Sequence, residues 1–211
     1  MRVVAIDGPA GSGKSTVARA VARRLGLEYL DTGAMYRAVA FAAMRRGIDP
    51  DEVDPVARVA TDLDLRLEAD GRVLVDGVDA TVEIRGPEVT RAVSIVAANP
   101  GVRDEMRRRQ REWATKHHGG VMEGRDIGTV VFPDAELKVY LDASPEVRAS
   151  RRSKEVADLA YETVAADLAR RDALDQGRTH GPLVEAPDAV TIDTSDLSVD
   201  EIIAAVLAHL S

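Results

Sequence analysis

A glycine-rich loop directly behind a short apolar run constrains the fold of this chain more than any other feature. The run is Val3–Asp7, and the loop at residues 8–16 reads GPAGSGKST. It fits the pattern G-x-x-x-x-G-K-[ST], in which glycines let backbone N–H groups turn inward around an anion. The helix that we expect at about 15–25 adds the positive end of its dipole. The sequence therefore predicts a strand, a phosphate-binding loop and a helix, in that order.

The lysine and serine that close this pattern indicate nucleotide chemistry. In such loops the lysine, here Lys14, reaches the outer phosphates, and the hydroxyl of Ser15 binds Mg²⁺. The alternative is a plain glycine-rich turn between a strand and a helix, which matches this pattern by chance in few chains, and the strand before and the helix after the motif make a chance match rarer still. We therefore predict that Lys14 is catalytic and that Ser15 is a metal ligand. The expected ATP-binding residues are Gly8, Pro9, Ala10, Gly11, Ser12, Gly13, Lys14, Ser15 and Thr16.

The composition of the chain excludes several other classes of protein. Its 211 residues suffice for one ordinary domain with small inserts. A net charge of −8 and an aromatic content of 3% argue against nucleic acid or an anionic membrane as a partner. The absence of cysteine excludes disulfides and thiolate catalysis. The first apolar run is too short for a signal peptide, so we expect a cytoplasmic protein with no membrane partner.

The remaining motifs separate the classes of nucleotide-binding protein. A GTPase needs an Asn-Lys-x-Asp segment to bind guanine, and the only asparagine is Asn99, which Pro100 follows. Transport and helicase ATPases usually need longer domains. Phosphoryl transfer to a small molecule is the activity that remains.

Short strand patterns alternate with helical ones along the chain. Strands are expected at 3–6, 121–122, 137–142 and 189–193. Helical patterns lie at about 15–25, 34–46, 87–98, 100–115, 145–159, 162–173 and 198–210. Single strands that alternate with helices indicate an α/β fold with a parallel sheet covered by helices on both faces.

One segment departs from this alternation. Residues 63–68 alternate apolar and charged side chains, and Asp-Gly pairs follow at 70–71 and 76–77. Two Asp-Gly turns between short alternating runs predict an antiparallel meander of two or three strands. Such an insert cannot extend a parallel sheet, so we expect it to form a lobe.

Three clusters could bind a second phosphate opposite ATP. In residues 31–37, a strand end delivers Thr32 as a helix cap and places Arg37 one turn into that helix. In residues 123–129, Arg125 leaves the end of a short buried strand, where ligands gather in open α/β sheets. The third cluster consists of arginines near 148–178, which a solvated helix face would also explain. The arginines at 107–111 are expected to be mostly solvated.

Taken together, these motifs resemble a known family. GPAGSGKST, YLDTGAMYR, EGRDIGTVVFPDA and RRDALDQGR follow in that order, and they are similar to the motifs of bacterial cytidylate kinases, in the nucleoside monophosphate kinase superfamily. The resemblance runs from Met1 to about Leu210 and includes the β insert. It implies the reaction ATP + CMP or dCMP → ADP + CDP or dCDP with Mg²⁺, in pyrimidine metabolism, by a monomer.

The resemblance also assigns roles to residues. Thr32, Arg37 and Arg125 would hold the acceptor phosphate, and Arg171 with Asp175 would hold the sugar. The mobile lid would carry Arg151 and Arg152, which with Lys14 and Arg125 would stabilise charge on the transferred group. The residues implied to bind the cytosine are Ser94, Arg103, Asp126 and Arg178.

Two departures from the family pattern bear on these roles. The first residue of the EGRD motif is often Asp in the family and is Glu123 here. The stretch at 172–175 reads DALD and is less charged than in some relatives.

The resemblance implies three functional parts. They are a core of residues 1–33, 87–147 and 174–211, an NMP-binding lobe of 34–86 with its β insert around 62–80, and a lid of 148–173. The alternatives are a kinase for another small acceptor, such as shikimate or a different nucleotide, and a nucleotide sensor without catalysis. The arginines of the acceptor side argue against a sensor, which needs no second phosphate site.

Overall fold

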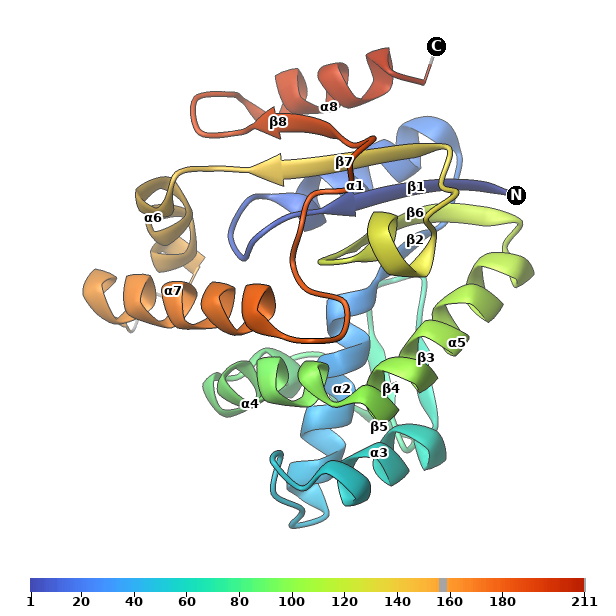
Figure 1. Cartoon of the computed structure of the whole chain (residues 1–211), viewed down its shortest axis with the longest axis vertical. Helices are drawn as coiled ribbons and strands as arrows, with labels where there is room; N and C mark the ends of the chain where they lie inside the picture. Colours follow the sequence, from blue (N-terminus) through green and yellow to red (C-terminus); the bar gives the residue numbers. More distant parts are fainter. Residues whose placement is uncertain (156–158, 211) are drawn as a thin grey trace. The chain divides into compact units, whose positions relative to one another are not determined.

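The computed structural model of the chain describes residues 1–155 and 159–210. The expected helix 145–159 and the expected lid extend in part over residues 156–158, which lie outside the described residues. The chain forms two compact units, one of residues 1–30 with the chain from Ala114 onward, and one of residues 31–113 (Figure 1). This division differs from the three expected functional parts, because residues 87–113 pack with the second unit.

The first unit is built on a parallel five-stranded sheet in the order β2-β6-β1-β7-β8. Its strands are β1 Arg2–Asp7, β2 Tyr29–Asp31, β6 Gly119–Gly124, β7 Leu137–Asp142 and β8 Val190–Asp193. Asp7 at the end of β1 is in register with Gly124 of β6 and Tyr140 of β7. The carboxyl ends of these three strands therefore meet at one edge of the sheet, as the parallel sheet predicts.

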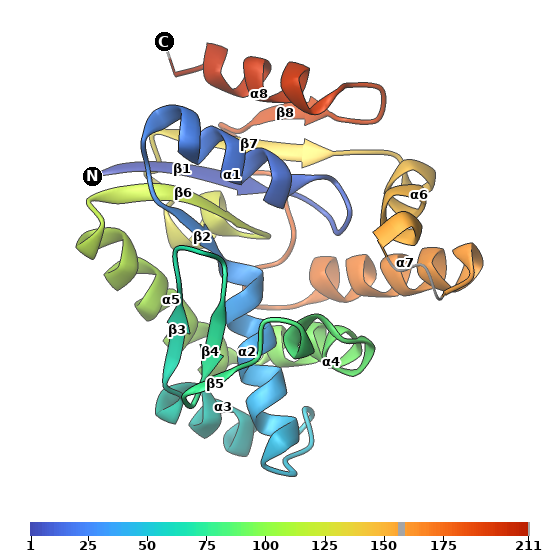
Figure 2. The ribbon, with the colours of Figure 1, turned by 180° about the vertical axis from the view of Figure 1, so that it is seen from behind.

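Two helices cover one face of this sheet, as Figure 2 shows. They are α1 Lys14–Leu25 and α8 Val199–Ala208. Val17 and Val21 of α1 and Ile202 and Val206 of α8 pack on the apolar side chains of the strands. A capping box of Ser198 and Glu201 starts α8. The opposite face carries a short π-helix at Ile127–Val131, which the sequence did not predict.

A helical hairpin completes the first unit. Helix α6 spans Pro145–Glu155 and α7 spans Tyr161–Gly177, four residues beyond the predicted end. Ala149 of α6 and Val164 and Leu168 of α7 are buried together with Ala10 of the phosphate loop. The hairpin therefore packs directly on that loop.

The second unit contains the predicted meander. Strands β3 Leu65–Leu67, β4 Val73–Val75 and β5 Val78–Asp79 pair antiparallel. Asp76 and Gly77 both have positive φ angles, of 50° and 78°, as a tight Asp-Gly turn requires. The helices of this unit are α2 Thr32–Arg45, α3 Val53–Asp62, α4 Pro87–Ala98 and α5 Pro100–Lys116, with a 3₁₀ turn at Glu83–Arg85.

Helix α3 is absent from the sequence prediction. Its segment carries a proline, Pro55, and it buries only the narrow stripe of Val56, Val59 and Ala60. Because proline is tolerated in the first turn of a helix, Pro55 does not interrupt it.

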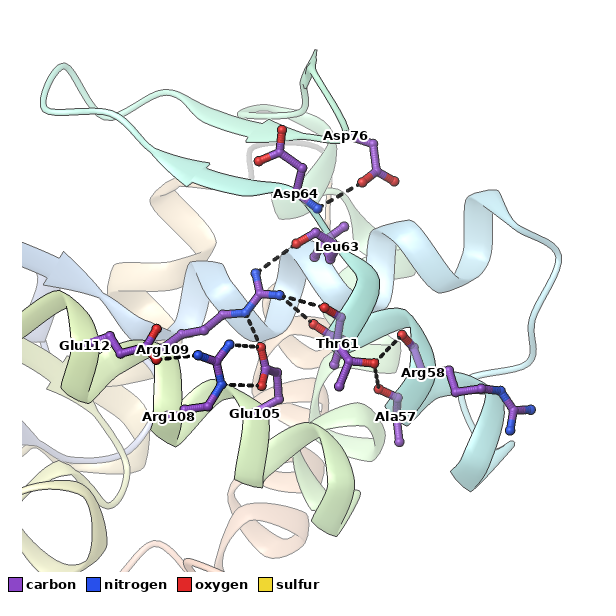
Figure 3. A network of polar contacts seen from close by, with 11 residues as sticks. Ala57, Arg58, Thr61, Leu63, Asp64, Asp76, Glu105, Arg108, Arg109 and Glu112 are labelled. Atoms are coloured by element: carbon purple, nitrogen blue, oxygen red, sulfur yellow. Dashed lines mark hydrogen bonds and ion pairs between the residues drawn. The ribbon is translucent and has the colours of Figure 1, made fainter.

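Arg109 of α5 joins α3 to the start of the meander, as Figure 3 shows. Its guanidinium donates hydrogen bonds to the carbonyls of Leu63 at 2.9 Å, Ala60 at 3.0 Å and Thr61 at 3.1 Å. Glu105 accepts a bond of 2.6 Å from Arg109 Nε and fixes the guanidinium. The arginines at 107–111 are expected to be mostly solvated, and Arg109 is an exception, because it satisfies the last carbonyls of α3.

Replacing Arg109 with Met should lower the free energy of unfolding by about 1–3 kcal/mol, because the partly buried carbonyls of Ala60 and Leu63 at the end of α3 lose their donor. Methionine keeps the length of the aliphatic stem. The matched control is Arg107→Met on the same helix, since Arg107 forms one ion pair with the exposed Asp104. Denaturant unfolding followed by circular dichroism measures both variants. Equal destabilisation by the two substitutions would contradict the capping role.

Candidate active site

The phosphate loop runs from β1 into α1 and has a backbone that only glycine can supply at two places. Gly8 has a φ angle of 148°, and a Cβ there would lie 2.0 Å from the carbonyl oxygen of Leu141 in β7. Gly13 has a φ angle of 91° and is the N-cap of α1. The loop thus takes the shape that its motif predicts, at the carboxyl edge of the sheet.

Lys14 is buried and folds back over this loop. Its Nζ donates to the carbonyl of Pro9 at 2.6 Å and to Ser12 Oγ at 3.5 Å. Burial lowers the pKa of Lys14 to about 7, and the positive charge of Arg125 contributes to this shift. An anion bound near Nζ would therefore stabilise the ammonium form.

Ser15 and Glu123 bring oxygen atoms together at the start of α1. Ser15 Oγ donates to Glu123 Oε2 at 2.9 Å, and the hydroxyl of Tyr29 donates to Glu123 Oε1. Among the described residues, no three side chains of His, Cys, Asp or Glu are grouped so as to hold a metal ion. Mg²⁺ commonly binds one or two protein oxygens and completes its shell with water and substrate phosphates. A serine hydroxyl beside a carboxylate fits such an ion.

Asp7 fixes the segment that carries Arg125 and Asp126. Its carboxylate accepts hydrogen bonds from the backbone N–H groups of Ile127 at 2.9 Å and Gly128 at 2.7 Å. Burial raises the pKa of Asp7 to about 6, although these two bonds act in the opposite direction. The sequence analysis did not single out Asp7, although it lies between the strand and the loop.

Beyond this segment, three guanidinium groups gather around two carboxylates in the first unit. Arg125 Nε donates to Asp175 Oδ2 at 2.9 Å. Arg178 lies 3.7 Å from Asp126 and 3.8 Å from Asp175. Burial, followed by the charge of Arg125, lowers the pKa of Arg171 to about 10. Arg171 Nε is buried without a hydrogen-bond partner among the residues that the structure describes.

The carboxylate of Asp175 remains ionised in this cluster. Burial raises its pKa, but the charges of Arg125 and Arg178 outweigh burial, so the net pKa lies below the ordinary value. Asp172 and Glu123 also act on the charge of Arg125, and the buried Arg171 Nε is the donor that an added acceptor would satisfy. Arg125, Asp126, Arg171, Asp175 and Arg178, which the resemblance assigned to CMP, thus lie together in this unit.

The arginines of α6 differ in their surroundings. Arg151 Nη1 donates to Thr194 Oγ1 at 2.9 Å, and the Thr194 hydroxyl lies 3.2 Å from the carbonyl of Ser12 in the phosphate loop. Arg152 instead pairs with the exposed Glu155 at 2.8 Å. Arg148 contacts the loop at Ala10.

The other four residues assigned to CMP lie in the second unit. Thr32, Ser94 and Arg103 are buried, and Arg37 is half-buried. Arg37 Nη1 donates to Thr90 Oγ1 at 2.8 Å and to the carbonyl of Ile84 at 3.1 Å. The Arg103 guanidinium lies 5.9 Å from the centroid of the Tyr36 ring.

One local expectation in this unit is wrong. The residue that caps α2 is Asp31, whose carboxylate accepts a bond of 2.9 Å from the N–H of Ala34. Thr32 is the first residue of the helix instead. An aspartate and a threonine side by side both suit a helix N-terminus, so the pattern alone did not separate them.

Among the described residues, no helix combines the length and apolar character that crossing a membrane requires.

Comparison with known proteins agrees with this arrangement. Residues 4–211 match the family model described as cytidylate kinase. The chain is 49% identical over 216 residues to a cytidylate kinase of Pelotomaculum thermopropionicum, an alignment that covers 99% of this chain and 95% of that protein. It is 50% identical over 208 residues to a cytidylate kinase of Mycobacterium avium, with coverage of 95% and 91%.

A solved structure of an uncharacterized protein from Eubacterium ventriosum is similar in fold alone, with a TM-score of 0.57 at 11% identity. That alignment covers 100% of this chain and 98% of the solved one. The two cytidylate kinases align with nearly the whole chain, and the family model matches it from Val4 to its last residue. The chain therefore belongs to the cytidylate kinase family.

Proposed function

We propose a division of roles among the residues of this kinase, which transfers the γ-phosphoryl group of ATP to CMP or dCMP and releases ADP and CDP or dCDP. The observation that carries the proposal is the proximity of two cations, the buried Lys14 and the half-buried Arg125, which follow the ends of the neighbouring strands β1 and β6. Arg125 lies close enough to Lys14 for its charge to lower the pKa of that lysine. Two cations held close together suit a phosphoryl group on which negative charge spreads during transfer.

On the donor side, the phosphates of ATP bind the loop of residues 8–16. Lys14 then leaves the carbonyl of Pro9 and contacts the outer phosphates. Arg151 and Arg152 act with Lys14 and Arg125 as the cations that stabilise the transition state. Arg151 is already held beside the loop by Thr194, whereas Arg152 pairs with the exposed Glu155.

Mg²⁺ is the proposed metal, held through Ser15 with Glu123 beside it. When bound, Mg²⁺ neutralises phosphate charge and orients the γ-phosphoryl group for transfer. Tyr29 and Ser15 hold one carboxylate oxygen each, so Glu123 is fixed in orientation before any ligand binds.

On the acceptor side, Thr32, Arg37 and Arg125 hold the phosphate of CMP. Arg171 and Asp175 hold the sugar. The residues proposed to bind the cytosine are Ser94, Arg103, Asp126 and Arg178. Within the described part of the chain, Arg171 Nε is buried without a hydrogen-bond partner, which supports a polar ligand at that position, because a buried donor without an acceptor is unfavourable.

We propose no general base for this reaction. The second pKa of a phosphate is about 6, so the attacking oxygen of CMP is already mostly deprotonated at neutral pH. Positioning and positive charge are then sufficient. We further propose that the enzyme acts in the cytoplasm as a monomer, in pyrimidine nucleotide metabolism.

Binding of ATP should take up protons at pH 8. Lys14, with a pKa of about 7, is mostly neutral at that pH in the free protein, and nearby phosphates raise its pKa so that the ammonium form returns. ATP affinity should accordingly fall as the pH rises above 7, by up to about tenfold per unit. Calorimetry of a non-hydrolysable ATP analogue in buffers of different ionisation enthalpy measures the uptake.

The control for this measurement is Lys14→Met. It should abolish the extra proton uptake and lower kcat by about 100-fold or more, with an unchanged circular dichroism spectrum. Uptake equal to that of the unmodified protein would show that another group titrates.

Arg37→Met should raise the KM for CMP by at least about tenfold and change the affinity for ATP less than twofold, because we assign Arg37 to the acceptor phosphate alone. The comparison variant is Arg46→Met on the segment that ends α2, where Arg46 pairs with the exposed Asp76. A coupled assay of ADP release gives the kinetics, and calorimetry gives the ATP affinity. Weakened ATP binding with an unchanged KM for CMP would place Arg37 on the donor side.

The same assay tests the acceptor itself. With Mg·ATP, we expect the highest kcat/KM for CMP or dCMP in a panel that also contains UMP, AMP and shikimate. A higher value for any of the last three would refute the proposed acceptor.

Changing all four histidines to Gln should leave kcat within a few-fold from pH 6 to 9. His118, His180 and His209 are exposed and His117 is half-buried. Loss of a general base typically costs 100-fold or more. A fall in kcat on that scale, at saturating substrates, would overturn the mechanism.

A further inference from the structure

The backbone of Ala10, inside the phosphate loop, is bound at both its N–H and its carbonyl by side chains of the α6–α7 hairpin. The Ala10 N–H donates to Asp172 Oδ1 at 3.2 Å. Arg148 Nη1 donates to the Ala10 carbonyl, also at 3.2 Å. Arg148 and Asp172 form an ion pair with each other as well. The three residues therefore form a closed set of contacts between α6, α7 and the loop.

This set of contacts is shielded from water. The side chains of Arg148 and Asp172 are 11% and 10% exposed. The loop also lies directly against α6, because a Cβ on Gly11 would be 3.1 Å from both Cβ and the carbonyl oxygen of Arg148. Hydrogen bonds to charged groups are roughly twice as strong as neutral ones, and low exposure reduces their screening.

Arg148 is itself held in one orientation. Its Nε donates to the carbonyl of Ala143 at 3.0 Å, just behind the end of β7. One guanidinium thus joins the end of the sheet, the phosphate loop and α7. Because both polar groups of Ala10 are bound, the peptide planes on its two sides are fixed, and the segment from Gly11 to Lys14 continues from a fixed point.

We propose that Arg148 and Asp172 are positioning residues for ATP, which hold the phosphate loop in its binding conformation through the backbone of Ala10 and do not themselves contact the nucleotide. The proposal rests on the assignment of residues 8–16 to ATP. It gives a function to Asp172, to which the sequence alone assigned no role beyond its place in the DALD stretch at 172–175.

A purely electrostatic role and a positioning role of Asp172 predict opposite changes in ATP affinity when the charge of Asp172 is removed. If Asp172 were merely an acid near the phosphates, Asp172→Asn would remove repulsion and strengthen ATP binding. If Asp172 positions the loop, the same nearly isosteric change loses the ion pair with Arg148 and a charged acceptor for the Ala10 N–H. Affinity for ATP should then fall by about tenfold, as expected for a hydrogen bond to a charged group.

The test measures the affinity of the whole protein for a non-hydrolysable ATP analogue by calorimetry. We expect Asp172→Asn and Arg148→Met each to weaken binding by about tenfold, and the double variant to be no weaker than the poorer single one, because both act through the same contacts. The KM for CMP at saturating ATP should change less than the ATP affinity does. The matched control is Asp167→Asn on the same helix, whose partner Arg170 is exposed; it removes the same charge and should leave ATP affinity unchanged.

Three results would overturn the proposal. One is unchanged or stronger ATP binding by Asp172→Asn. Another is a loss confined to Arg148→Met, which would mean that Arg148 contacts the nucleotide directly. The third is additive losses in the double variant, since independent effects do not share one set of contacts. A different result would show that the assignment of residues 8–16 to ATP is itself wrong. That result is normal ATP binding by Lys14→Met.

A measurement without mutation applies even where a variant does not fold. In the ligand-free protein, the amide hydrogen of Ala10 should exchange with deuterium at least about 100-fold more slowly than an unprotected amide, because Asp172 accepts it in a buried site. Exchange at the unprotected rate would overturn the proposal. Nuclear magnetic resonance resolves this single amide.

Discussion

The buried ammonium group of Lys14 is the constraint on which the rest of the site depends. A cation taken out of water is unfavourable unless nearby groups compensate for the lost hydration. Here the compensation comes from the carbonyl of Pro9 and the charges of Glu123 and Asp7, but burial and Arg125 still bring the lysine pKa down to about 7. An anion bound near Lys14 would favour the ammonium form. In the proposed function, a nucleotide phosphate is that anion.

The parallel sheet places these groups. Asp7, Glu123 and Asp142 lie at or near the carboxyl ends of three adjacent strands, so the loop, the EGRD segment and the start of α6 begin from one edge. Each end has a separate function. The end of β1 feeds the phosphate loop, the end of β6 carries Glu123 and Arg125, and the chain after β7 supplies the carbonyl that orients Arg148. The side chain of Asp7 connects the first two through backbone amides.

Local patterns in the sequence predicted the elements whose signals are local. The motif located the phosphate loop, apolar periodicity located α1, α4 and α8, and the two Asp-Gly pairs located the meander. Contacts between distant residues were not predictable in this way: Ala10 and Asp172 are 162 positions apart, and Arg109 reaches carbonyls 46 to 49 positions away. Short elements such as β2 and α3 also lack enough residues for a clear period. The family resemblance supplied most of the candidate site, because roles such as those of Arg171 and Asp175 depend on tertiary position.

The close approach of Gly8 to the carbonyl of Leu141 has a consequence for the sheet itself. The phosphate loop packs closely against the neighbouring strand β7 where it leaves β1, so β7 forms part of the surface that supports the loop. Each residue of a strand advances by about 3.3 Å, so a shift of the β1–β7 register by two residues would move Gly8 by about 7 Å relative to β7. Strand register is usually regarded as a property of the fold. In this chain the register of β1 and β7 also sets the position of the loop along the sheet edge, and therefore the position at which the phosphates of ATP bind in the proposed function.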